Sequence, residues 1–564
     1  MTVAPVARWH RVLAATVASV LFLASVLGIS RARQQAGDRP VAAAPESSPT
    51  PTPPPRPGTA PPTPAPTATA EPRDPALALA DPDAAAALGA DRLLAAGLAA
   101  AQGPWRDLGD AAWPTRNERP VYVGAVALDD DGGRVTADLV VATRLSEPAG
   151  ELVLRLLPGA RALGDGTGLT VTATVDGDVT EAVVDRDGAR LVVPLGRERG
   201  AGEAVLLRFD VTYDLVTVGR IVDDGGPAAF GLLASHPVGA TLGHWLPLLT
   251  LPGEDGAMVP WGDVGGFPVA IWSLRTVHDG TLVTGGADGD CPEPAAGGRA
   301  CTWSRGIALR DVSAVLYHEE PVTAATDVAG IRHRAVAAVG TAAAAEAVLG
   351  EVVGAAVSFG NRFGALAWNE VDTVAVPLGR GAAGMEFPGL SLIDDEQWTE
   401  IEGGFGTAVI AHEIAHQWFH ALVGNGSLSS PVVDESLAQY LSYLYWQDTY
   451  GPAAARAYAQ RSFLDRYEAA RARGVRDEAP AQPVDAFPDA ETYGVMVYAR
   501  APLAWVAAED ELGAEAVEAF LGQVVSRYGL DTVSDRQLVE DAFAFDPELG
   551  AILQRAWFTD EPLA

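Results

Sequence analysis

The chain has 564 residues and a formal net charge of -34, with 73 acidic residues against 39 Lys and Arg. This length exceeds what one hydrophobic core organises, so we expect two or three domains. The negative charge repels phosphate backbones and excludes a typical nucleic-acid-binding protein. Every Lys or Arg position is Arg, which excludes chemistry that needs a lysine amine, such as Schiff-base formation.

Residues 1–35 contain an apolar run, Val12 to Ile29, that is preceded by Arg8 and Arg11. As a helix the run would be about 27 Å long, close to the thickness of a bilayer core. It is a secretory signal or a membrane anchor. No small-residue cleavage site follows it, so we expect a single-pass anchor at the cell membrane with an extracytoplasmic catalytic domain. The chain would be secreted if this segment were cleaved.

Residues 36–75 are rich in proline and have almost no large apolar residue. This composition cannot build a core and predicts an extended, disordered tether. The next segment, 76–118, is rich in Ala and Leu at helical spacing, which predicts a helical lead-in to the first globular domain.

Residues 119–322 alternate between polar and apolar positions over short lengths, as in "RVTADLVVATRL", and Gly/Asp turns separate these stretches. The pattern predicts an antiparallel β domain. Its two cysteines, Cys291 and Cys301, lie in a Gly/Pro-rich loop. Outside the reducing cytosol we expect them to form a disulfide, with two free thiols as the alternative.

Residues 323–564 change to a helical period. The stretch "RAVAAVGTAAAAEAVLGEVVGAAVSFG" predicts a long amphipathic helix, and "VDTVAVPLG" and "GLSLID" predict strands. We therefore expect a mixed, mainly helical second domain, and a multi-domain α+β protein as a whole.

A cluster of histidines lies in this second domain, at His412, His416 and His420. On a helix, residues four apart lie on one face, so His412 and His416 can reach one metal ion. Glu413 is turned about 100° from His412, toward a metal-bound water rather than the metal. The alternative is a helix in which the histidines have no metal-binding role.

A catalytic zinc needs a third protein ligand and one open position. The favoured ligand is Glu435, in a second predicted helix that a short turn folds back toward the first. His420 competes with it, but a metzincin would have Gly and His where this chain has Phe419 and Leu422. We expect one Zn²⁺ ion, held by Glu435 and the two spaced histidines.

The motif "HEIAHQWF", followed after eighteen residues by Glu435, resembles the gluzincin zinc aminopeptidases of the aminopeptidase N and leukotriene hydrolase family. The resemblance implies a saddle-like antiparallel β domain at 119–322 and a thermolysin-like catalytic domain at 323–564. It also makes His420 a bystander. We expect the long C-terminal helical domain of larger family members to be missing.

Two more motifs resemble this family. "AAGMEFPGL" is similar to its exopeptidase loop, which implies substrate binding by Gly384, Met385 and Glu386, with the Glu386 carboxylate facing the substrate's α-ammonium. Ala383, Gly384 and Phe387 depart from the commonest version of that loop.

The second motif, "TYGVMVYARAPLAWV", is similar to the segment that carries the family's catalytic tyrosine. The resemblance places that tyrosine at Tyr498, with Tyr493 the less favoured choice. A phenol there can donate to the oxyanion that forms when water attacks the peptide carbonyl.

The sequence thus predicts a zinc aminopeptidase that acts on peptides, with Glu413 as the base. One alternative is a zinc endopeptidase or another hydrolase on the same scaffold. The other is a surface binding module without activity. The sequence indicates no oligomeric state.

Overall fold

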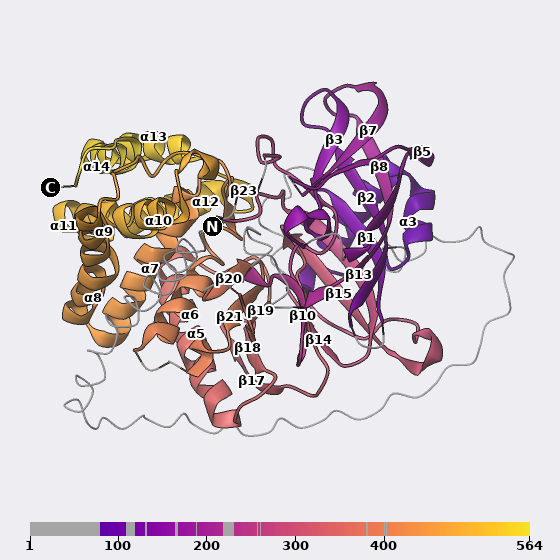
Figure 1. The fold of residues 1–564 in the computed structure, drawn as a ribbon, viewed down its shortest axis with the longest axis horizontal. Helices are drawn as coiled ribbons and strands as arrows, with labels where there is room; N and C mark the ends of the chain where they lie inside the picture. The colour runs from indigo at the N-terminus through magenta and orange to yellow at the C-terminus, as the bar shows by residue number, and fades with distance from the viewer. Residues whose placement is uncertain are drawn as a thin grey trace, which may run out of the picture. The chain divides into compact units, whose positions relative to one another are not determined.

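The computed structural model describes residues 79–108, 119–129, 132–163, 167–187, 189–217, 230–256, 258–259, 261–379, 382–399, 401 and 403–563. Figure 1 shows the chain coloured from indigo to yellow in sequence order. The predicted membrane segment and the Pro-rich tether lie outside the described residues. Residues 75–564 form one compact unit.

The described chain begins with two helices, α3 (Pro82–Leu88) and α4 (Ala90–Gln102), within the predicted lead-in. The Asp81 carboxylate caps α3 by accepting from the backbone N–H groups of Asp83 and Ala84. The apolar face of α4 is buried in a core that includes residues of the first sheet, such as Val121 and Ile271. Both helices therefore pack as part of the β region.

The β region is built on a seven-stranded sheet. In spatial order its strands are β15 (Ala300–Leu309), β13 (Ala270–His278), β1 (Val121–Leu128), β2 (Arg134–Arg144), β8 (Ala204–Asp214), β4 (Thr170–Val175) and β5 (Asp178–Thr180). All pairs are antiparallel except β1 and β13, which run parallel with Val121 opposite Ile271. The predicted antiparallel domain is thus mostly correct, but this pair and the short pair β9 (Val216–Thr217) with β10 (Leu233–His236) are parallel, which sequence alternation cannot distinguish.

Two smaller sheets complete the β region. One has the order β14 (Thr281–Thr284), β16 (Ala314–Tyr317), β11 (Gly239–Leu242), β10 (Leu233–His236) and β9 (Val216–Thr217). The other has the order β12 (Leu248–Leu249), β3 (Ala149–Arg155), β7 (Arg190–Arg199) and β6 (Val183–Asp185). Cys291 and Cys301 form a disulfide, as expected, next to the start of β15.

A mixed five-stranded sheet begins the second half of the chain. Its order is β17 (Val322–Val328), β18 (Ile331–Ala337), β19 (Glu370–Val376), β21 (Leu390–Asp394) and β20 (Gly384–Phe387). The predicted long helix is α5 (Ala342–Phe363), but the first residues of the predicted helical stretch, 334–337, belong to strand β18 instead. Helix α5 connects the parallel strands β18 and β19 and packs on β17 and β18. Strand β20 forms one edge of this sheet and contains the motif "GMEF".

Helices follow the sheet to the end of the described chain, drawn in orange and yellow in Figure 1. They are α6 (Phe405–Ala415), α7 (Val432–Tyr450), α8 (Pro452–Ala459), α9 (Arg466–Arg473), α10 (Ala490–Val495), α11 (Leu503–Leu512), α12 (Ala514–Tyr528), α13 (Asp535–Phe545) and α14 (Pro547–Phe558). Two π-helical turns, η10 (Gln460–Asp465) and η12 (Met496–Arg500), and a two-stranded pair, β22 (Val423–Gly424) with β23 (Asp531–Thr532), interrupt them. The predicted α+β class is confirmed, and the exact domain boundaries stay a prediction.

Among the helices of the described residues, α5 is long enough and apolar enough to cross a membrane. Helices α3 and α4 reach that length and apolar character only when taken together, and the pair is bent by 117°. Residues of α5 such as Val348, Val352 and Phe359 are buried. These helices therefore do not support a membrane association. The membrane segment that the sequence predicts lies in residues 1–35.

Candidate metal centre

Helix α6 carries the His-Glu-x-x-His motif and is buried on nearly every side. Its own apolar residues, such as Val409, Ile410 and Ile414, are buried in the core, so its polar side chains must find partners or ligands there. His412 and Glu413 lie in its last turn, and His416 is its C-terminal cap.

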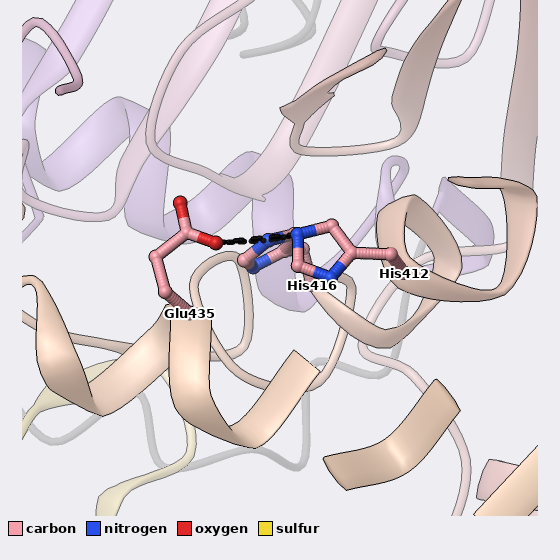
Figure 2. A group of neighbouring side chains, drawn as sticks. All are labelled: His412, His416 and Glu435. Atoms are coloured by element: carbon pink, nitrogen blue, oxygen red, sulfur yellow. Dashed lines mark hydrogen bonds and ion pairs between the residues drawn. The ribbon is translucent and has the colours of Figure 1, made fainter. Parts of the chain in front are cut away.

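The structure brings His412, His416 and Glu435 together. The Nε2 atoms of the two histidines are 3.1 Å apart, and Oε2 of Glu435 lies 3.2 Å from Nε2 of His412 and 3.5 Å from that of His416. Figure 2 shows the glutamate, from α7, with its carboxylate directed at both imidazole rings. Three donor atoms thus converge on one point from two helices.

The orientation of these groups suits a metal. Nδ1–H of His416 donates to the carbonyl of Phe419 over 3.0 Å, which leaves Nε2 free to act as a ligand. Among the described residues, Oε2 of Glu435 has no hydrogen bond of good geometry although it is buried. Two imidazoles and a carboxylate with an unsatisfied oxygen fit a catalytic zinc site with one open position.

The charge states of His412 and Glu435 agree with this assignment, whereas the carboxylates of Glu386, Glu435 and Glu413 outweigh burial and raise the pKa of His416 well above its usual value. Burial lowers the pKa of His412, which favours the neutral imidazole that binds metals. Burial alone would raise the pKa of Glu435, but the imidazoles of His412 and His416 beside its carboxylate lower it instead. Glu435 is therefore an anion at neutral pH.

Glu413 lies beside the predicted metal ligands, as the sequence predicts. Its side chain is buried, and its Oε2 atom has no hydrogen-bond partner among the described residues. Burial and the nearby Glu386 carboxylate raise its pKa well above the usual value. A buried carboxylate with a raised pKa and a free oxygen is suited to accept a proton from water.

Glu386, on strand β20, also lies next to the predicted metal site. One carboxylate oxygen each from Glu386 and Glu413 lies within 4.8 Å of the other and of a ring nitrogen of His416. Burial raises the pKa of Glu386 to about 7. Gly384 and Met385, the other predicted substrate-binding residues, are half-buried on the same strand.

Two departures from the expected loop have structural explanations. An ideal Cβ at Gly384 would lie 2.4 Å from Oε1 of Glu413, so a glycine at this position leaves room for the Glu413 side chain. Phe387 is buried with its ring 5.0 Å from that of His244 and packs against Gly243. Its side chain therefore fills the core rather than the site.

Tyr498 lies within the π-helical turn η12, a distortion that is often found at functional sites. Its hydroxyl donates to Oε1 of Glu435 over 2.6 Å, so it reaches the metal centre directly. Burial and the charge of Glu435 raise its pKa well above 10, which keeps it a proton donor. Tyr493 packs edge-on against Tyr498 at 5.9 Å between ring centroids.

Sequence reasoning missed the residues that hold the connection between α6 and α7. Arg310, at the end of β15, is buried, and its guanidinium donates to the carbonyls of Ala421, Phe267 and Asp531 over 2.7–3.0 Å. It also packs against Gly424, where a Cβ would lie 2.3 Å from the guanidinium carbon. No motif marks Arg310, because its partners are backbone atoms.

Glu254 has a matching role from another loop of the β region. Its buried carboxylate accepts hydrogen bonds from the N–H groups of Gly266, Leu428 and Ser429 over 2.9–3.1 Å. Residues 428 and 429 lie just before α7, which carries Glu435. The β region thus fixes the segment that sets the distance between the ligand helices.

His420 does not join the predicted zinc ligands. Its Nδ1 atom lies 3.2 Å from Oδ2 of Asp434, and its ring centroid is 6.0 Å from that of His416. Its φ of +144° is uncommon for a residue with a side chain. The structure therefore places His420 beside the predicted zinc site in a separate cluster.

Comparison with known proteins agrees with this description. Residues 359–550 match the sequence model of the Peptidase family M1 domain. The fold is similar to the M1 zinc metallopeptidase from Deinococcus radiodurans, with a TM-score of 0.59 and 18% identity over 79% of this chain and 96% of that chain. For a mutant of that protein bound to a Tyr-ser-ala substrate, the TM-score is 0.57 and the identity 17%, again over 79% of this chain and 96% of that chain. No curated protein sequence matches the chain.

The fold and the site together define a metal centre of the gluzincin type, in which a His-Glu-x-x-His helix and a second helix supply the ligands. Residues of both helices lie within the segment that matches the peptidase family M1 domain. The predicted resemblance to the aminopeptidase N family is thereby confirmed at the level of the family.

Proposed function

We propose that this protein is a zinc-dependent aminopeptidase that removes N-terminal residues from peptides. The observation that carries the proposal is the position of Glu386, whose carboxylate reaches the metal centre from the edge strand β20. An anion this close to the metal favours substrates whose chain ends there in an ammonium group. A substrate that continued past this point would leave a buried carboxylate without a partner.

His412, His416 and Glu435 would hold the zinc ion. When bound, zinc polarises the scissile carbonyl and lowers the pKa of a water at its open position toward about 7. Glu413, with its unpartnered oxygen, accepts the proton of the attacking water and passes it to the leaving amine. The buried surroundings strengthen both electrostatic effects because little water competes.

Tyr498 has the second catalytic role. Its hydroxyl, now 2.6 Å from Glu435, is close enough to donate to an oxyanion that develops next to the metal. Such a contact is stronger in the transition state than in the ground state, so it accelerates the reaction rather than merely binding the substrate.

The proposal is tested by comparing a free-amine peptide with its N-acetylated twin. We expect cleavage of the first only, and we expect Glu386→Gln to raise KM for the free-amine peptide by at least about tenfold, since an ion pair with the ammonium is lost. Glu396→Gln is the matched control, because Glu396 is exposed. Equal cleavage of both peptides would indicate an endopeptidase, and a protein without stoichiometric zinc would indicate a binding module.

We further propose that the catalytic part lies outside the cytoplasm, attached through residues 1–35 or secreted after their removal. The disulfide between Cys291 and Cys301 supports this location, because such bonds persist in oxidising compartments. Protease treatment of intact cells should remove membrane-bound activity. Activity that resists the protease until the cells are lysed would contradict the proposal.

A further inference from the structure

A second cluster of potential metal ligands lies next to the predicted zinc site. Asp263, Glu386 and His420 each offer one ligand atom, and these atoms lie within 4.8 Å of one another. The three residues come from separate segments: a loop of the β region, the edge strand β20 and the loop that follows α6. The fold, rather than local sequence, assembles this cluster.

His420 is oriented as metal-binding histidines usually are. Its Nδ1 atom is 3.2 Å from the carboxylate of Asp434, which leaves Nε2 as the ring nitrogen available to a ligand. A carboxylate behind the imidazole fixes its tautomer and makes it a better ligand. The backbone at His420 also has a φ of +144°, and uncommon conformations of this kind are concentrated at functional sites.

The two carboxylates of the cluster have few hydrogen-bond partners within the protein. Glu386 is only 8% exposed, and no hydrogen bond or ion pair of its side chain is found among the described residues. Asp263 is partly exposed, and its Oδ1 atom accepts only from the N–H of the adjacent Val264 over 2.6 Å. Two acidic groups with free oxygens beside an imidazole make a site that is complementary to a cation.

A third possible group, formed by Glu386, Glu413 and His416, does not represent an independent site. It shares His416 with the predicted zinc ligands and Glu413 with the predicted catalytic machinery. The cluster of Asp263, Glu386 and His420 contains none of these. The ring centroids of His416 and His420 are 6.0 Å apart, so the two sites are neighbours.

We propose that Asp263, Glu386 and His420 form a second divalent-cation site, which takes Zn²⁺ or a similar ion that accepts nitrogen and oxygen ligands. The consequence for activity rests on the proposed function, in which Glu386 holds the substrate's α-ammonium. An ion in this site occupies the same carboxylate and therefore excludes the ammonium. Excess zinc then inhibits the enzyme in competition with its peptide substrate.

Metal stoichiometry tests the site without reference to activity. The protein that retains one zinc per chain after dialysis should bind a second equivalent when titrated with ZnCl₂. Asp263→Asn and His420→Gln should each weaken this second binding by at least about tenfold and keep the first zinc. His318→Gln and Glu319→Gln are matched controls, because both residues are exposed.

The outcomes separate the site from the proposed function. A wild-type protein that binds only one zinc in excess metal would overturn the site, as would variants that keep the second zinc. If Asp263→Asn only raised KM for free-amine peptides while wild type bound one zinc, the cluster would be an ammonium subsite instead. If a higher peptide concentration did not relieve the inhibition by zinc, the proposed competition between zinc and substrate would be rejected.

Discussion

The hydroxyl of Tyr498 donates a 2.6 Å hydrogen bond to Oε1 of Glu435, the carboxylate that also faces both metal-binding histidines. A residue in a π-helical turn is thereby joined to a ligand on α7, 63 residues earlier in the chain. This bond holds the phenol next to the predicted metal site in the absence of substrate. When a substrate binds, the phenol has only a short distance to move before it can donate to an oxyanion.

Tyr498→Phe should therefore reduce kcat by about 10²- to 10³-fold, the usual effect of removing an oxyanion donor. KM and zinc content should change little, because the ring and all three ligands remain. Steady-state kinetics on an amino-acid arylamide, with metal analysis, measure this. Tyr493→Phe is the control and should stay within a few-fold of wild type; a larger effect at Tyr493 would reverse the assignment.

Gly384→Ala should impair the base without removing the metal. The new Cβ would lie 2.4 Å from Oε1 and 2.7 Å from Cγ of Glu413, so that side chain must move. We expect kcat to fall by about tenfold or more, since a small displacement of a catalytic group is costly. Gly350→Ala is the control, because nothing lies within 4 Å of a Cβ at that position. Normal activity in the first variant would show that Glu413 tolerates the displacement.

Arg310→Met should destabilise the whole protein. The change leaves the carbonyls of Ala421, Phe267 and Asp531 without their donor, and each buried unsatisfied group costs about 1 to 3 kcal/mol. We expect the free energy of unfolding to fall by about 3 kcal/mol or more, measured by denaturant titration. The control is Arg473→Gln, because Arg473 is exposed and paired with Glu491. This variant should lower the free energy of unfolding by less than about 1 kcal/mol. Similar losses in the two variants would contradict the role of Arg310.

A buried charge cluster makes stability depend on pH. Arg334 forms ion pairs with Asp372, with Glu370 over 2.8 Å and with Asp288 over 3.6 Å. Burial raises the pKa of Asp288 to about 6 and that of Glu370 to about 7. Both carboxyls keep protons in the folded state that the unfolded chain releases, so their contribution is present below about pH 4 and is lost as pH rises to about 7.

Comparison of wild type with Glu370→Gln isolates this effect from that of buried histidines. Burial lowers the pKa of His236 and His333 to about 4, which acts in the opposite direction. Between pH 5 and pH 8 wild type should lose about 2 kcal/mol more than the variant, corresponding to one or two pKa units. Melting temperatures across this range measure the difference. Parallel pH profiles would show that Glu370 is ionised throughout.

The local part of the site is predictable from sequence because helical geometry fixes it. Two histidines four residues apart must share a face of α6, and a short turn brings α7 back with Glu435. The fold class is predictable for a similar reason, since the change from alternating to helical periodicity marks the start of the mainly helical second half of the chain. The strands β17 and β18 at the beginning of that half are not predicted by this pattern. The strand β20 is harder to predict, because it has only four residues at a sheet edge.

The supporting residues could not be predicted in this way. Arg310 and Glu254 act on backbone groups 111 and 174 residues away, and no spacing in the sequence relates such positions. The cluster of Asp263, Glu386 and His420 depends on the same long-range packing. His420, which the sequence reduces to a bystander, has a defined position only once Asp263 and Asp434 are placed around it.

The central claim is that Glu413 is the base of a zinc-dependent hydrolysis. Glu413→Gln keeps the shape of the side chain and all three metal ligands but cannot accept the proton of water. The most direct measurement is kcat on an amino-acid arylamide together with zinc content in the same preparation. We predict one zinc per chain and a kcat lower by about 10²- to 10⁴-fold, the usual contribution of a general base. Unchanged kcat with zinc bound would contradict the assignment.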